Sequence, residues 1–303
     1  MDGSIDALQL NLNNDGLLVM NVSLAIIMFG VALELTINDF KQLIRQPKGP
    51  LIGLFSQFVL LPAGTFLLIL ALKPQPSIAL GMMMVAACPG GNISNFISSI
   101  AGGNLALSVT ITACATLLAM IMTPINFSFW AGLYPPTNAI LKEVSLNFWE
   151  VAQIVFLILG IPIVLGMITR HYKENLAKKL STWIRGFGVL FFSAFVVIAF
   201  TMNFDQFLTY VHHVLLFVFL HNLLALSGGF GLAAAFRLPF ADRKSIAIET
   251  GIQNSGLGIV LILTFFNGLG GMLLVAAWWG IWHIVAGLSL SWFWNRTRTK
   301  QSS

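Results

Sequence analysis

The chain has 303 residues, of which 57% are hydrophobic and only 9% are charged, and its mean hydropathy is +0.86. A water-soluble core of this size does not need so much apolar sequence, so the composition excludes an ordinary soluble domain and indicates an all-α polytopic membrane protein. The formal net charge of +5 is therefore interpreted through the distribution of basic residues between loops, and nucleic acid is not expected as a partner.

Apolar runs predict about nine transmembrane helices. Their expected ranges are 17–35, 49–72, 78–101, 105–133, 148–168, 184–202, 210–235, 240–266 and 272–294. The polar stretches NDFKQLIRQPKG and YPPTNAILKEVS, which follow the first and fourth runs, are interpreted as loops. Cys88 and Cys114 lie inside apolar runs without metal-ligand spacing and are interpreted as packing residues.

Two of the predicted spans are interrupted. In the third, CPGGNISN (88–95) places Pro89 and two glycines inside the apolar run, and in the eighth the glycines near 251–256 weaken the helix. The two breaks lie at comparable places in the two halves of the chain, which indicates an inverted repeat. We therefore expect a core made of a first repeat (49–133) and a second repeat (210–294), and a separate panel made of 17–35 and 148–202.

Basic residues set the expected orientation. All of the 16 Lys and Arg residues except Lys73 and Lys142 fall in loops on the same side as the C-terminus. By the positive-inside rule this side is cytoplasmic, in the cell's inner (plasma) membrane. Residues 1–16, which lack the build of a signal peptide, are then an extracytoplasmic tail, and residues 295–303 are a cytoplasmic tail.

The stretch IAIETGIQNSGLG (246–258) contains the acid expected to lie deepest in the bilayer, Glu249. An ionised carboxylate at the centre of a membrane helix costs roughly 3 kcal/mol on insertion scales, so an acid placed there indicates a functional site. Gln253, Asn254 and several glycines follow it. An acid, amide oxygens and the free carbonyl groups of a broken helix together predict a cation site.

The sequence resembles the bile acid:sodium symporter family over nearly its whole length. The resemblance is carried, in this order, by MFGVALELTINDF, QFVLLP, CPGGNISN with GNLALSVTITACAT, ETGIQNSGLG and WHIVAG. It implies a symporter that imports an organic anion, such as a bile acid or a small carboxylate, by alternating access with two sodium ions. Bacterial members commonly have ten helices, whereas this chain resembles the nine-helix animal members.

The resemblance also implies particular site residues. One sodium site would use Ser94, Asn95, Ser108, Thr112 and Glu249. A second would use Gln57, Glu249, Gln253 and the backbone carbonyl groups of Thr250 and Ile252. The organic anion would contact Asn92, the backbone of Ile93, Asn254 and His283, near half-helix N-termini whose dipoles favour negative charge.

Other interpretations stay open at this point. Ser108 and Thr112 alone would favour ordinary hydrogen bonding between membrane helices. A proton- or sodium-coupled antiporter of similar crossed-helix architecture could use Glu249, but gives no reason for the neutral ligands around it. An intramembrane enzyme is not expected, since the sequence has no metal-binding His-Glu spacing, no paired catalytic acids and no nucleophile elbow. No motif distinguishes a bile acid from a small carboxylate.

Overall fold

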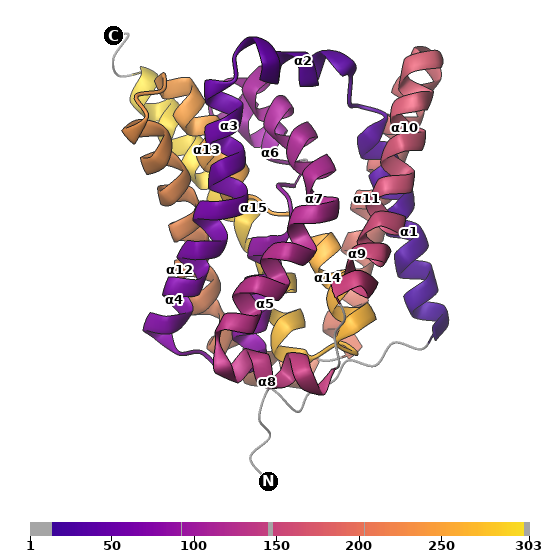
Figure 1. Ribbon diagram of the computed structural model, residues 1–303, viewed down its shortest axis with the longest axis vertical. Helices are drawn as coiled ribbons and strands as arrows, with labels where there is room; N and C mark the ends of the chain where they lie inside the picture. The colour runs from indigo at the N-terminus through magenta and orange to yellow at the C-terminus, as the bar shows by residue number, and fades with distance from the viewer. Residues whose placement is uncertain (1–13, 92, 145–147, 203, 300–303) are drawn as a thin grey trace.

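The computed structural model describes residues 14–91, 93–144, 148–202 and 204–299 (Figure 1). In these ranges the regular secondary structure is helical, which confirms the all-α fold class. The first half contains α1 (Asn14–Ala32), α2 (Ile37–Arg45), α3 (Lys48–Phe55), the π-helical η2 (Ser56–Leu60), α4 (Leu61–Leu72), α5 (Pro76–Ala87), α6 (Ile93–Ile100), α7 (Leu105–Leu133) and α8 (Pro135–Glu143). The second half contains α9 (Phe148–Val155), the π-helical η3 (Phe156–Gly160), α10 (Ile161–Tyr172), α11 (Glu174–Met202), α12 (Phe204–Ala235), α13 (Phe240–Gly251), α14 (Ser255–Phe265) and α15 (Gly270–Thr299).

Several of these helices are long and apolar enough to cross a membrane. Among the described residues five qualify, namely Lys48–Leu72, Leu105–Leu133, Ala152–Tyr172, Val214–Ala235 and Gly270–Arg296. The bent pair α1 and α2 would make a sixth, and α5 and α14 are shorter apolar helices. The protein is therefore a polytopic membrane protein, and nine spans stays a prediction.

Two stretches interpreted as loops are short helices, so that part of the prediction was wrong. At the start of α2, the Asp39 carboxylate accepts hydrogen bonds from the backbone N–H (2.6 Å) and the hydroxyl (2.9 Å) of Thr36. The Thr36 N–H, which has no partner within the helix, is thereby hydrogen-bonded. In α8 the prolines occupy the first helical positions, where a missing N–H costs nothing. Helix α11 also begins at Glu174, ten residues before the predicted span.

The helices form two groups (Figure 1). Helices α1, α9, α10 and α11 lie on one side, and α1 packs against both α10 and α11. Close approach of α1 and α10 needs Gly166, since a Cβ there would lie 2.9 Å from the Phe29 carbonyl oxygen. Helix α2 crosses one end of the molecule from α1 to α3, while α8 lies at the opposite end. We call the first group the panel and the other helices the core.

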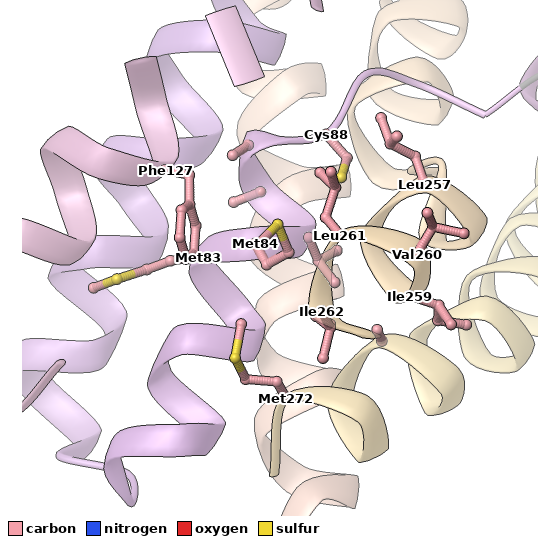
Figure 2. Close-up of a cluster of buried hydrophobic side chains, with 14 of the residues drawn as sticks. Met83, Met84, Cys88, Phe127, Leu257, Ile259, Val260, Leu261, Ile262 and Met272 are labelled. Atoms are coloured by element: carbon pink, nitrogen blue, oxygen red, sulfur yellow. The ribbon is translucent and has the colours of Figure 1, made fainter. Parts of the chain in front are cut away.

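An apolar cluster joins the half-helices α5 and α14 inside the core (Figure 2). Met84 of α5 lies beside Leu261 of α14, while Met83 points away toward Phe127 of α7, and Met272 of α15 lies below them in this view. All five side chains are buried. This packing fixes the two half-helices relative to each other, and both lead directly into the breaks.

Candidate cation and anion sites at the crossed helices

The two helix breaks are paired with each other. Cys88, which follows α5, and Ile252, which follows α13, both have extended backbone. The Gly91 N–H donates to the Ile252 carbonyl oxygen at 2.8 Å, and the Asn254 N–H donates to the Pro89 carbonyl oxygen at 2.9 Å. Gly90 and Gln253 form the antiparallel bridge between these bonds. The structure therefore shows both predicted breaks and joins them in one crossing.

The two glycines of CPGGNISN are required by the closeness of this crossing. A Cβ at Gly90 would lie 3.3 Å from the Glu249 carbonyl oxygen and would also meet the Glu249 carboxylate. A Cβ at Gly91 would lie 3.0 Å from the Gln253 carbonyl oxygen. Any larger side chain would push the two segments apart.

Side chains satisfy the carbonyl groups that the breaks leave without helical partners. Gln57 donates to the Cys88 carbonyl oxygen (2.9 Å), Gln253 to that of Thr250 (2.7 Å), and Asn222 to that of Gly251 (2.7 Å). Unpaired backbone groups are costly away from water, so these amides allow non-helical backbone inside the bundle.

The Glu249 carboxylate lies beside the crossing and is surrounded by hydroxyl groups. Its side chain is 1% exposed. Ser94 of α6 donates to it at 2.6 Å, and Thr112 and Ser108 of α7 donate at 2.7 Å and 3.2 Å. The Thr112 hydroxyl also lies 3.2 Å from the Asn95 side-chain oxygen. The structure therefore brings together all five residues that the resemblance assigned to the first sodium site.

A second polar group lies on the other side of the break in α13. The Gln57 and Gln253 amides bond reciprocally, with Nε2 to Oε1 distances of 2.7 Å and 3.2 Å. The carbonyl groups of Thr250 and Ile252 each already accept one hydrogen bond, from Gln253 and from the Gly91 N–H. In the described part of the chain, no hydrogen bond joins Glu249 to either glutamine. The structure thus groups the neutral second-site residues and directs Glu249 toward the first site.

Gln57 lies in the π-helical segment η2, where each backbone hydrogen bond spans five residues instead of the four of an α-helix. Such segments are frequent at functional sites. In the same segment, the Ser56 hydroxyl is 2.8 Å from the Thr250 hydroxyl, and both residues are buried. Sequence reasoning missed Ser56 and the π segment, although Ser56 directly precedes a predicted ligand.

The predicted anion-binding residues are less closely grouped. Asn92 lies outside the described residues. Ile93 begins α6 and is 37% exposed. Asn254 caps α14, accepting from the Leu257 N–H at 3.1 Å, and its Nδ2 lies 3.9 Å from the Met28 sulfur on α1. Asn254 therefore lies where the crossing meets the panel.

His283 is placed beside the same break by its helix. A Cβ at Gly280 would lie 2.8 Å from the Ser255 hydroxyl oxygen, and one at Gly287 would lie 3.0 Å from the Ile252 side chain. His283 is three residues from one glycine and four from the other, so all three share one face of α15. Its side chain is 5% exposed, and its Nδ1 atom has no hydrogen-bond partner among the described residues.

Discontinuous helices that cross around a buried charge define a secondary transporter. A sequence profile of the sodium bile acid symporter family matches residues 21–210, so the chain belongs to this family, whose members are transporters and not enzymes.

Among its relatives, the uncharacterized sodium-dependent transporter YocS of Bacillus subtilis is 31% identical over 94% of this chain and 85% of the relative. A probable chloroplastic sodium/metabolite cotransporter, BASS1 of Arabidopsis thaliana, is 30% identical over 92% of this chain and 67% of the relative. The human sodium/bile acid cotransporter 4 is 29% identical over 84% of this chain, which spans 57% of that protein. The family and these names support a sodium-coupled transporter.

Proposed function

We propose that this protein is a symporter that imports an organic anion, such as a bile acid or a small carboxylate, together with two sodium ions. The observation that carries the proposal is the buried Glu249 carboxylate, held by three hydroxyl groups beside two crossed helix breaks. An acid in this position is costly unless it has a cationic partner, and sodium would supply one.

The first cation site would lie among the hydroxyl groups around Glu249. Each of Ser94, Ser108 and Thr112 donates its hydrogen to the carboxylate and keeps oxygen lone pairs for a cation. Asn95 adds an amide oxygen beside Thr112. Hard cations take oxygen ligands, and one carboxylate with several neutral oxygens suits reversible sodium binding.

The second cation site would lie at the break in α13. It would combine the Gln57 and Gln253 amide oxygens with Glu249 and with the second lone pairs of the Thr250 and Ile252 carbonyl oxygens. Because the two amides now bond each other, both must turn before their oxygens face one cation. Binding at this site would therefore reorganise the contact between η2 and the break.

The anion would bind where the crossing meets the panel. The N-termini of α6 and α14 carry partial positive charge, and Ile93 and Asn254 mark these ends. His283 borders the same break, and Asn92 belongs to the proposed set although it lies outside the described residues. Alternating access would then be a rocking motion of the panel against the core, since Asn254 contacts Met28 across their boundary.

The proposed orientation places the C-terminus in the cytoplasm and the N-terminus outside the plasma membrane. Helix α2 and the junction of α10 with α11, both rich in Lys and Arg, lie at the same end of the molecule (Figure 1). The positive-inside rule assigns this end to the cytoplasm.

Uptake by purified protein in proteoliposomes tests the proposal. A sodium gradient should drive accumulation of at least one compound from a panel of bile acids and small carboxylates, and a proton gradient without sodium should not. Uptake driven by the proton gradient alone would overturn sodium symport and favour a proton-coupled mechanism with Glu249 as the exchanging group.

A further inference from the structure

Helix α12 carries two adjacent polar side chains that are completely enclosed. His221 is 0% exposed and Asn222 is 1% exposed, inside a span that has no charged residue. Neither residue belongs to the proposed cation or anion sites. Buried polar side chains in membrane helices need partners, so their partners show what they hold in place.

Asn222 replaces a backbone hydrogen bond that the break in α13 removes. In a continuous helix, the Ser255 N–H would donate to the Gly251 carbonyl oxygen four residues earlier. Here the Ser255 N–H donates to the Gln253 carbonyl oxygen at 2.9 Å, and Asn222 donates to Gly251 at 2.7 Å instead. The side chain of α12 therefore supplies the donor that lets α13 end at Gly251.

His221 attaches the same turn of α12 to α4. Its Nε2 lies 2.6 Å from the Thr65 hydroxyl oxygen, and Thr65 donates its only hydroxyl hydrogen to the Leu61 carbonyl oxygen at 2.7 Å. The Thr65 hydroxyl therefore links the first turn of α4 to His221. Leu61 directly follows η2, the segment that contains Gln57.

One turn of α12 thus holds the break in α13 through Asn222 and, through His221 and Thr65, the first turn of α4 that directly follows η2. We propose that Asn222 is a positioning residue for the second cation site. Its hydrogen bond to Gly251 holds the break in the conformation in which Gln253 faces Gln57 and bonds the Thr250 carbonyl group. This inference rests on the proposed sodium coupling and adds a residue that is not itself a ligand.

Sodium-dependent thermal stabilisation of the purified full chain in detergent tests the inference without an organic substrate. The ligand is sodium chloride, with choline chloride at equal ionic strength as the reference. Sodium that binds only the folded protein stabilises it by an amount that rises with the ratio of the sodium concentration to the dissociation constant. Asn222→Leu removes the hydrogen-bond donor and keeps a similar side-chain volume. We expect this variant to need about five- to tenfold more sodium than the wild type for equal stabilisation, which corresponds to the loss of one hydrogen bond. Its stabilisation should also depend less steeply on sodium concentration.

A double-mutant cycle separates positioning from general destabilisation. If Asn222 acts through the second site, Asn222→Leu should add little to the sodium response of Gln57→Ala, because the site is already lost. Ser227→Ala is the matched control on α12, since the Ser227 hydroxyl bonds within its own helix and the residue is exposed. The serine side chain in Asn222→Ser is too short to bond the Gly251 carbonyl oxygen, so this variant should behave like Asn222→Leu. If the leucine variant does not fold, the serine variant is used in its place.

The outcomes distinguish this inference from the proposed function. An unchanged sodium response in both Asn222 variants, or an effect that adds fully to that of Gln57→Ala, would overturn the role of Asn222 alone. A wild-type protein that sodium stabilises no more than choline does would overturn the cation sites, and the positioning role with them.

Discussion

Gln57 and Gln253 face each other with both amides paired, although they are 196 residues apart and belong to different halves of the chain. Each amide donates its N–H to the oxygen of the other. A cation that takes both oxygens has to compete with both hydrogen bonds, so ion binding and the geometry of the crossing are linked. The predictions below use this link and the buried acid beside it.

Replacement of Glu249 by glutamine should abolish sodium-driven uptake. The substitution keeps the size of the side chain and removes the negative charge proposed to face both cations. Uptake against sodium concentration in proteoliposomes is the measurement, with the folded state checked by size-exclusion chromatography. Transport with unaltered sodium dependence would show that the cation sites are wrongly assigned.

Gln57→Ala and Ser108→Ala should separate the two cation sites. Gln57→Ala removes a neutral ligand from the second site only, so uptake should depend less steeply on sodium concentration. Ser108→Ala removes a ligand from the first site, where Ser108 is 3.2 Å from the Glu249 carboxylate. Both changes should also weaken anion binding, because sodium and anion affinities are reciprocally linked. If Gln57→Ala behaves like the wild type, one sodium ion rather than two accompanies the anion.

Transport of a monovalent anion should carry current. Two sodium ions and one such anion move one net positive charge per cycle, while Glu249 stays with the protein. An inside-negative potential would then contribute about 2.3 kcal/mol per 100 mV and should accelerate uptake. Potassium diffusion potentials imposed with valinomycin provide the test, and a divalent anion is the control, since its transport would be electroneutral. Indifference of monovalent uptake to the potential would rule out the two-to-one stoichiometry.

A covalent link between panel and core should stop transport. A Cβ at Gly160 of η3 would lie 2.9 Å from the Met120 sulfur on α7, so a short bismaleimide linker can span cysteines at these two positions. The control pair is Glu34→Cys with Arg185→Cys, because these residues form an ion pair on the panel side and the same linker spans them. The native Cys88 and Cys114 are both buried. Crosslinking should block uptake only in the first pair, and full uptake by the linked protein would contradict the rocking motion.

Lys244→Met should destabilise the fold. The Lys244 side chain is 3% exposed, its Nζ donates to the Ala101 carbonyl oxygen at 2.7 Å, and it lies 4.9 Å from the Phe240 ring centroid. Methionine keeps the apolar stem and leaves the carbonyl group without this donor, so we expect a loss of about 1–3 kcal/mol. The loss is measured as a lower thermal unfolding temperature, and Lys142→Met, at an exposed lysine, is the control. Equal unfolding temperatures for the two variants would show that the buried ammonium group contributes nothing to stability.

Local sequence signals were sufficient for the helical class and for both breaks. Pro89 with its two glycines and the glycine-rich stretch after Glu249 lower helix stability through their own backbone chemistry, so both breaks could be predicted without knowing their neighbours. A single proline is not enough, since Pro124 lies inside continuous α7. The acid itself was marked by the cost of burying it. The grouping of Ser94, Ser108 and Thr112 around it came from the family resemblance, since isolated hydroxyl residues in membrane helices have no distinctive pattern.

Features that depend on distant partners could not be predicted in this way. Pro62 follows the π-helical turn at Gln57, as Pro162 follows η3, but the direction of the Gln57 amide depends on distant partners at Cys88 and Gln253. Asn222 is a single amide in an apolar run, and its partner Gly251 lies in another helix. Helix α2 was missed for a different reason: its charged residues were read as a loop, although its apolar residues recur at helical spacing.

The backbone pairing between the two breaks has a consequence for how the chain reaches its native state in the membrane. The Gly91 N–H bonds to the Ile252 carbonyl oxygen and the Pro89 carbonyl oxygen to the Asn254 N–H, so these two groups of the first break find their partners in the second half of the chain. While the ribosome is still synthesising that half, these two groups have no native counterpart. We therefore expect an N-terminal fragment ending after α7 to insert but to remain protease-sensitive near the break, and to become protected when the C-terminal half is supplied as a separate polypeptide.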